Sequence, residues 1–163
     1  MAIVWKLGSD VDTDQIVPGR YAPYMTSEET LCAHVFIEAR PDFAKTVSPG
    51  DVIVAGPNFG CGSSREYAPR ALKVVGIAAI FAPSFARIFY RNATNLGIPL
   101  FEIDLTDAVD DGQEVRLDLD APELRAREAT YALPDPPAFV RRIWDAGGAI
   151  EYYRQTGRFP GQE

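Results

Sequence analysis

Gly-Pro-Asn-Phe-Gly-Cys-Gly-Ser-Ser-Arg, residues 56–65, separates an apolar segment at residues 51–55 from a segment whose apolar side chains recur at helical spacing. The first segment predicts a strand, and the spacing of Ala68, Leu72 and Val75 predicts an amphipathic helix. Glycine at positions 60 and 62 permits positive φ angles and a close approach of the backbone to a ligand. The stretch therefore predicts a glycine-rich turn from a strand to a helix.

Two hydroxyls and a guanidinium, those of Ser63, Ser64 and Arg65, follow the glycines at the predicted helix start. Unpaired N–H groups in the first turn, the positive end of the helix dipole and the arginine all favour an anion, so a carboxylate or phosphate is the expected ligand. The alternative is an ordinary tight turn in which Ser63 or Ser64 caps the helix. Nucleotide motifs fit poorly: no Gly-Lys-Ser/Thr ending is present, and Arg65 stands where a dinucleotide fingerprint has its third glycine.

The alternation of strand and helix continues to residue 103. Residues 77–82 are a continuous apolar run, which is typical of a strand buried on both faces. Ser84 is expected to cap a helix that ends at Gly97, and residues 99–103 predict a further strand. Residues 51–103 thus contain two crossover units of a parallel sheet. Arg87 and Arg91 share one face of the second helix, where solvation beside acidic neighbours is the simplest role.

Shorter elements are expected on either side of these crossover units. Residues 3–7 predict a strand, and Thr26 with Glu29 predicts a capping box that opens a helix to residue 39. On that helix His34 is expected to be a packed or surface residue. Residues 114–119 and 129–133 predict a small antiparallel element, followed by short helices at 139–144 and 150–153. We expect one α/β domain over residues 1–163, with a central, mostly parallel sheet and flanking helices.

Composition excludes several classes of protein. The formal net charge of −7 disfavours nucleic acid and anionic membranes as partners, because both reward a basic surface. Two cysteines and one histidine do not supply the ligands of an iron–sulfur cluster, so we expect no metal bound by this chain alone. The amino-terminal residues carry no secretory pattern, and no apolar run reaches the length of a membrane span. A cytoplasmic protein with reduced thiols is expected.

Four stretches together closely resemble the small-subunit family of 3-isopropylmalate dehydratase and homoaconitase, within the aconitase superfamily. They are residues 12–21 (Asp-Thr-Asp-Gln-Ile-Val-Pro-Gly-Arg-Tyr), 58–69 (Asn-Phe-Gly-Cys-Gly-Ser-Ser-Arg-Glu-Tyr-Ala-Pro), 84–92 (Ser-Phe-Ala-Arg-Ile-Phe-Tyr-Arg-Asn) and 157–161 (Gly-Arg-Phe-Pro-Gly). The resemblance covers almost the whole chain. It implies an aconitase-type swivelling β/β/α domain that exists as a separate polypeptide.

The resemblance also implies a division of labour between two chains. In this family a large subunit carries a four-iron four-sulfur cluster, which acts as a Lewis acid on the substrate, and the small subunit caps the site. The expected partners are therefore that large subunit, in a heterodimer or heterotetramer, and a small di- or tricarboxylate substrate. The expected reaction is the isomerisation of 2-isopropylmalate to 3-isopropylmalate, a step of leucine biosynthesis, by dehydration and rehydration.

Site residues follow from the resemblance position by position. Ser63 matches the serine whose alkoxide removes a proton from the carbon next to a carboxylate, and Ser64 and Arg65 match residues that bind the substrate carboxylates. Asp14 matches an aspartate that lines the same cleft. A serine is a poor base unless its alkoxide is stabilised, and positive charge near the hydroxyl lowers the pKa of such a group. A planar guanidinium also binds a carboxylate through two hydrogen bonds.

Substrate choice is expected to lie in residues 21–26, which match the specificity loop of the family. Where homoaconitase-like members often place an arginine, this loop offers Tyr21, Tyr24, Met25 and Thr26, and its apolar character suits an isopropyl group. Arg20 is near enough in sequence to hold a distal carboxylate, so a homoaconitase small subunit of lysine biosynthesis is the alternative. A module that binds a carboxylate without chemistry is a third possibility.

Overall fold

The computed structural model describes residues 1–63 and 66–162. Ser64 and Arg65, for which carboxylate binding is predicted, lie outside the described residues. In chain order the elements are β1 (Ala2–Lys6), α1 (Thr13–Ile16), the 3₁₀ helix η1 (Gly19–Tyr24), α2 (Glu28–Ala33), α3 (Phe43–Thr46), β2 (Val52–Val54), α4 (Tyr67–Val74), β3 (Ala79–Ala82), α5 (Arg87–Asn95), β4 (Leu100–Glu102), β5 (Glu114–Asp118), β6 (Glu123–Ala126), β7 (Ala129–Ala132), α6 (Ala138–Ala146) and α7 (Ala149–Thr156).

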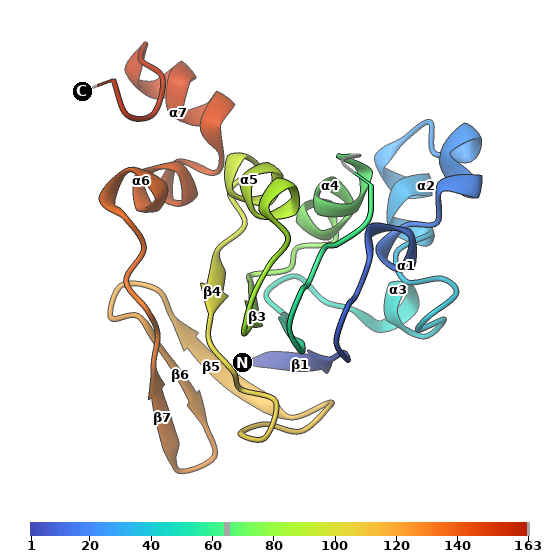
Figure 1. The fold of residues 1–163 in the computed structure, drawn as a ribbon, viewed down its shortest axis with the longest axis horizontal. Coiled ribbons are helices and arrows are strands. Elements are labelled where there is room, and N and C mark those ends of the chain that lie inside the picture. The colour runs from blue at the N-terminus through green and yellow to red at the C-terminus, as the bar shows by residue number, and fades with distance from the viewer. Residues whose placement is uncertain (64–65, 163) are drawn as a thin grey trace.

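The strands of the described residues form one sheet of seven in the order β4-β3-β2-β1-β5-β6-β7. Strands β1 to β4 pair in parallel with one another, whereas the pairs β1–β5, β5–β6 and β6–β7 are antiparallel. Helices α4 and α5 connect β2 to β3 and β3 to β4, as two crossover units should. Figure 1 shows α1, α2, α4 and α5 on one side of the parallel strands, while β5–β7 and α6 lie toward the other end of the molecule. The predicted α/β fold is confirmed.

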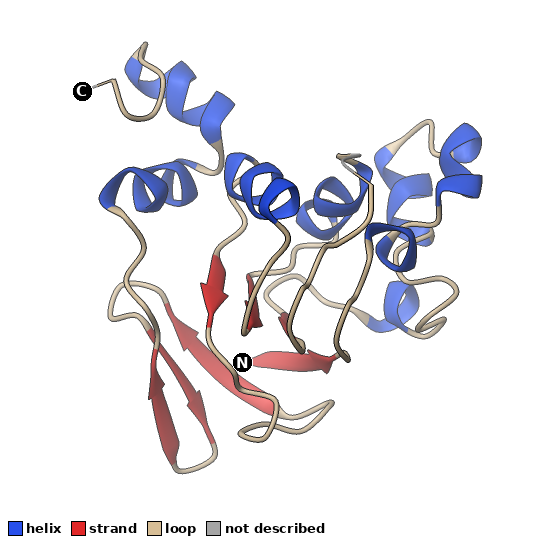
Figure 2. Cartoon of the chain, viewed as in Figure 1, coloured by secondary structure: helices blue, strands red, loops and turns tan. Residues whose placement is uncertain are grey.

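Each face of the parallel strands packs into a core of its own. Ile53 and Ile80 belong to the core under the helices, whereas Val52 and Phe81 belong to the core shared with β5, β6 and α6. Successive side chains of a strand point to opposite faces, so burial on both faces requires an unbroken apolar run. Strand β3 is buried at all of its positions, which explains why its sequence shows no alternation. Figure 2 shows the resulting separation of helices from strands.

Two predictions about helix starts are wrong. The cap of α2 is Ser27, whose hydroxyl accepts a hydrogen bond from the Thr30 N–H, rather than Thr26 with Glu29. The helix also ends at Ala33 instead of residue 39, because Phe36 takes a left-handed φ of 53° and its N–H donates to the Ile16 carbonyl. Burial of the Phe36 ring thus overrides the local helix pattern. Ser84 does not cap α5, which begins at Arg87 after Ala86.

The antiparallel part is larger than the sequence predicts. Strand β6 was missed, and it lies between β5 and β7, so residues 114–119 and 129–133 do not pair directly as expected. The two predicted helices at the carboxyl end are present as α6 and α7. The predicted specificity loop at residues 21–26 overlaps η1. Across the described residues no helix is long and apolar enough to cross a bilayer.

Candidate active site

Three loops meet at the carboxyl ends of the parallel strands, where α/β sheets place their ligand sites. They follow β1, β2 and β3, and the middle one is the glycine-rich stretch. On one side the Gly60 N–H donates to the Val11 carbonyl over 2.7 Å, and on the other the Phe59 N–H donates to the Ser84 carbonyl over 3.1 Å. The hydroxyl of Ser84 accepts from the Asn58 N–H at 2.8 Å. Hydrogen bonding between adjacent segments therefore continues past the strand ends, and the glycine-rich loop is bonded to the loops on both sides of it.

An aromatic anchor fixes the middle of this loop. Phe59 is fully buried, and its ring meets Phe85 and Phe89 edge-on at 6.1 and 5.3 Å between centroids. Gly60 follows with a φ of 83°, and a side chain there would overlap the ring of Phe89. Glycine is thus required at position 60 by both backbone conformation and space.

Ser63 lies at the exposed end of the loop, against the buried Thr13. The Ser63 N–H donates to Thr13 Oγ1 over 3.1 Å, and the two side-chain oxygens are 3.2 Å apart. Helix α4 begins only at Tyr67 with Glu66 at its N-cap position, so Ser63 is not the cap that the alternative interpretation required. Ser63 is therefore an exposed residue that precedes the helix and whose hydroxyl contacts Thr13.

Asp14 and Arg20 lie on the adjoining turn. The Asp14 carboxylate accepts a hydrogen bond from the Gly19 N–H at 3.3 Å, at the start of η1. Arg20 donates to the Tyr21 hydroxyl at 2.9 Å and forms an ion pair with Glu38. The hydrogen bond to Tyr21, followed by the attraction of Glu38, raises the pKa of Arg20 above its ordinary value. Arg20 is therefore already paired in this structure, which the sequence did not indicate.

The predicted specificity loop combines exposed and partly buried side chains. Tyr24 is 68% exposed at the end of η1, and the Tyr21 ring lies 4.7 Å from the ring of the half-buried His34 at an angle of 39°. Met25 and Thr26 line a cavity of about 80 Å³ together with Tyr67 and Arg70 of α4. These two α4 residues were not singled out from the sequence, because only the fold brings α4 beside this loop.

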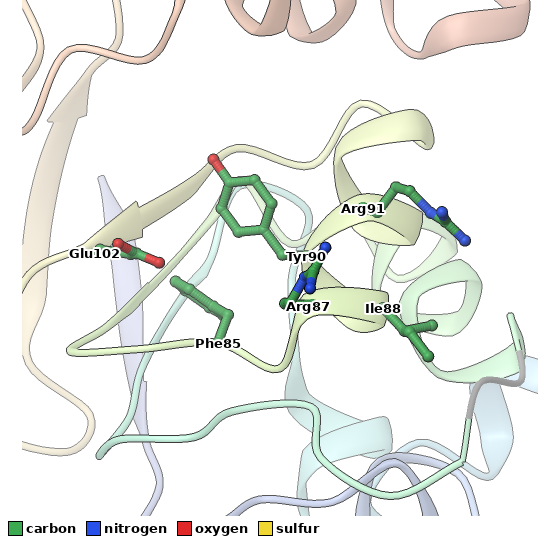
Figure 3. A pocket seen from close by; sticks show the side chains of 6 residues that line it. All are labelled: Phe85, Arg87, Ile88, Tyr90, Arg91 and Glu102. Atoms are coloured by element: carbon green, nitrogen blue, oxygen red, sulfur yellow. The ribbon is translucent and has the colours of Figure 1, made fainter.

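A second cavity, of about 590 Å³, opens beside the start of α5. Figure 3 shows Glu102 and Phe85 at one end of this opening and Ile88 and Arg91 at the other. Burial, followed by the charge of Glu102, raises the pKa of the Tyr90 phenol. Arg87 and Arg91 are exposed as expected, but within the described residues no ion pair joins either of them to an acidic neighbour. The cavity borders the glycine-rich loop through the Phe59–Phe85 contact.

Cys61 is the thiol of the glycine-rich loop, and it is partly buried and free of any disulfide. Burial, followed by the charges of Asp12 and Asp10, raises the pKa of this thiol. A cluster ligand must be a thiolate, and over residues 1–63 and 66–162 no three His, Cys, Asp or Glu side chains gather as a metal site. An iron–sulfur cluster therefore does not fit the described residues of this chain.

The fold and the site together define a β/β/α domain whose candidate site lies at the carboxyl ends of the parallel strands. Comparison with known proteins identifies the family of this domain: residues 12–104 match the model of the Aconitase C-terminal domain. The chain belongs to that family. The matched range contains the loops after β2 and β3 and, from Asp12 onward, the segment that follows β1.

Individual relatives agree with this assignment. The chain is 50% identical to the 3-isopropylmalate dehydratase small subunit 1 of Deinococcus radiodurans over 163 residues, covering 100% of this chain and 92% of the relative. It is also 50% identical to the homoaconitase small subunit of Thermus thermophilus, covering 99% and 100%. The crystal structure of 3-isopropylmalate dehydratase from Methanocaldococcus jannaschii superposes with a TM-score of 0.89 at 43% identity, covering 96% of this chain and 93% of the other.

Proposed function

We propose that this chain is the small subunit of a hydro-lyase of the aconitase family, active only with a large subunit, and that its substrate is 2-isopropylmalate. The observation that carries the proposal is the exposed Ser63 hydroxyl, held at the carboxyl ends of the parallel strands in a chain half identical to such small subunits. The reaction interconverts 2- and 3-isopropylmalate by dehydration and rehydration, in the cytoplasm.

Ser63 acts as the base in this proposal. As an alkoxide it takes the proton from the carbon next to a carboxylate, and the hydroxyl returns that proton during rehydration. Ser64 and Arg65 hold the carboxylates of the substrate, and Asp14 lines the cleft. The iron–sulfur cluster of the large subunit would supply Lewis-acid chemistry at the departing hydroxyl.

The exposed position of Ser63 supports a site shared between two chains. A base that removes a proton from carbon works best with water excluded, and this chain leaves the serine open to solvent. Large side chains stand exposed on segments that border the same strand ends, with 68% for Tyr24, 40% for Tyr67 and 48% for Ile88. We propose that the large subunit covers this rim and forms the opposite wall of the site.

The exposed loop favours isopropylmalate over a tricarboxylate. Tyr24 and Met25 offer no charge to a distal carboxylate, and Arg20 is occupied by Tyr21 and Glu38. A homoaconitase small subunit is the second candidate, because the Thermus thermophilus relative is as similar as the Deinococcus radiodurans one. A carboxylate-binding module without chemistry is the remaining alternative, and Ser63 separates it from both enzymes.

The test is reconstitution with the cognate large subunit under anaerobic conditions. We expect turnover of 2-isopropylmalate, with kcat/KM above the values for homoaconitate and citrate. Ser63→Ala should lower kcat by about 10²- to 10⁴-fold and leave assembly intact by size-exclusion chromatography. Ser48→Ala, an exposed serine at the opposite ends of the strands, is the matched control and should retain full turnover. Activity of the isolated chain, or unchanged activity of Ser63→Ala, would contradict the proposal.

A further inference from the structure

Resting on the proposed function, we propose that Thr13 is a positioning residue that orients the Ser63 hydroxyl and donates a hydrogen bond to it once it has lost its proton. Thr13 is only 5% exposed, so it offers little surface for direct contact with a substrate. Its hydroxyl nevertheless contacts the hydroxyl of the exposed Ser63. The two residues are 50 positions apart in the chain: Thr13 begins α1, which follows β1, and Ser63 lies in the loop after β2.

Thr13 is itself held by its surroundings. It is the first residue of α1, whose cap is a reciprocal pair: the Gln15 N–H donates to Asp12 Oδ1 at 2.9 Å, and the Asp12 N–H donates to Gln15 Oε1 at 3.0 Å. The Thr13 N–H donates to the Cys61 carbonyl at 2.8 Å. The backbone of Thr13 is therefore tied to the glycine-rich loop independently of its side chain.

The hydroxyl of Thr13 has one hydrogen and two places to donate it. Its oxygen accepts from the Ser63 N–H at 3.1 Å, and its hydrogen points either to the Ser63 carbonyl at 3.4 Å or to Ser63 Oγ at 3.2 Å. While Ser63 is neutral, either hydroxyl serves as donor between the two side chains. Once Ser63 is an alkoxide, only Thr13 has a hydrogen to give, and a charged acceptor forms the stronger bond.

This contact therefore gains strength only when the serine ionises. An interaction that favours the charged form of an acid lowers its pKa. A further observation supports the role: a Cβ at Gly62 would stand 3.1 Å from Thr13 Oγ1, so the glycine leaves the space through which the threonine hydroxyl approaches the loop. Threonine also has few rotamers because it branches at Cβ, which keeps its hydroxyl in place.

The experiment uses the reconstituted two-subunit enzyme with Thr13→Val, Thr13→Ser and a matched control. Thr13→Val keeps the shape and removes the hydroxyl, so kcat should fall at least about tenfold with KM within about twofold, and the acid limb of the kcat profile should move up by about one pH unit. Thr13→Ser restores a hydroxyl and should keep kcat within about threefold of wild type. The control is Thr94→Val, because Thr94 is as buried and its hydroxyl oxygen has no hydrogen-bond partner within the described residues.

Several outcomes overturn the inference. A wild-type kcat and pH profile in Thr13→Val would do so, and so would an equal loss in Thr13→Ser, since that would assign the effect to the methyl group. Should Thr13→Val fail to assemble, Thr13→Cys keeps a side chain of similar size with a weaker donor, and it must show the same fall in kcat and the same shift of the acid limb. The proposed function is judged separately, by turnover of the wild-type complex and its loss in Ser63→Ala.

Discussion

The two loops that border the candidate site are held in different ways. The glycine-rich loop, residues 56–63, is hydrogen-bonded to both neighbouring segments and carries the fully buried Phe59. The predicted specificity loop, residues 21–26, includes the end of the 3₁₀ helix η1, none of whose described residues is buried. Next to it Arg20 contacts Glu38 and Tyr21, Tyr21 contacts His34, and the partly buried Met25 packs against the edge of the core.

Under the proposed function, this difference lets one domain meet two requirements. Proton removal requires a base held in a fixed position, since small displacements of a reacting group reduce rate strongly. Substrate selection requires only that side chains of suitable chemistry face the distal group, and such segments vary without disturbing the core. Exposed ion pairs stabilise little, so the Arg20–Glu38 pair adds little to the stability of the fold.

The largest effect on stability is expected from a substitution that displaces the glycine-rich loop. Gly60→Ala combines a left-handed backbone with overlap on the Phe89 ring, so the free energy of unfolding should fall by about 3 kcal/mol. Urea unfolding of the isolated chain measures this. Gly112→Ala is the control: its φ is 77° and a Cβ there would meet no atom within 4 Å, so only the backbone cost of about 1 kcal/mol should appear. Equal losses in the two variants would show that Phe89 does not confine the loop.

The next largest effect is expected on substrate selectivity, and it tests the predicted specificity loop. Tyr24→Arg introduces a cation at an exposed position, so the ratio of kcat/KM for homoaconitate to that for isopropylmalate should rise about tenfold in the reconstituted enzyme. The melting temperature should not change. Tyr24→Gln removes the ring without adding charge and should not raise the ratio. An unchanged ratio in Tyr24→Arg would place the selecting residue elsewhere.

A smaller effect is expected on the reactivity of Cys61, the thiol of the glycine-rich loop. Because burial and then Asp12 and Asp10 raise the pKa of Cys61, less thiolate forms at neutral pH than for a free cysteine. In a Cys32→Ser background, the rate of reaction with iodoacetamide should reach its half-maximum at a higher pH than it does for free cysteine. A midpoint at lower pH would mean that positive charge dominates around Cys61 and that the loop surroundings differ from those described.

The smallest effect is expected for Arg20. Its side chain is 67% exposed, and its contacts with Tyr21 and Glu38 lie at the surface. Arg20→Ala should therefore leave the melting temperature of the isolated chain within about 1 °C of wild type. A fall of several degrees would show that the specificity loop is as firmly integrated as the glycine-rich loop, and the contrast between the two would be lost.

The parallel half of the molecule was predictable because its signals are local. Continuous apolar runs at β2 and β3 reflect burial on both faces, and the glycines between strand and helix mark the turns. Strand β6 escaped prediction because its alternation, with Leu124 and Ala126 buried, spans four residues only. The early end of α2 was missed because the hydrogen bond from Phe36 to Ile16 is not local.

By itself the sequence determined the order of the crossover units, the chemistry of the glycine-rich stretch and the family to which its motifs point. Tertiary structure alone decided that Thr13 supports Ser63, that Arg20 is paired with Glu38, and that Tyr67 and Arg70 adjoin the specificity loop. The physical reason is the distance along the chain over which each kind of interaction acts. Side-chain periodicity and turn residues act over a few positions, whereas these contacts join segments that meet only after strands pair and both faces of the sheet are covered.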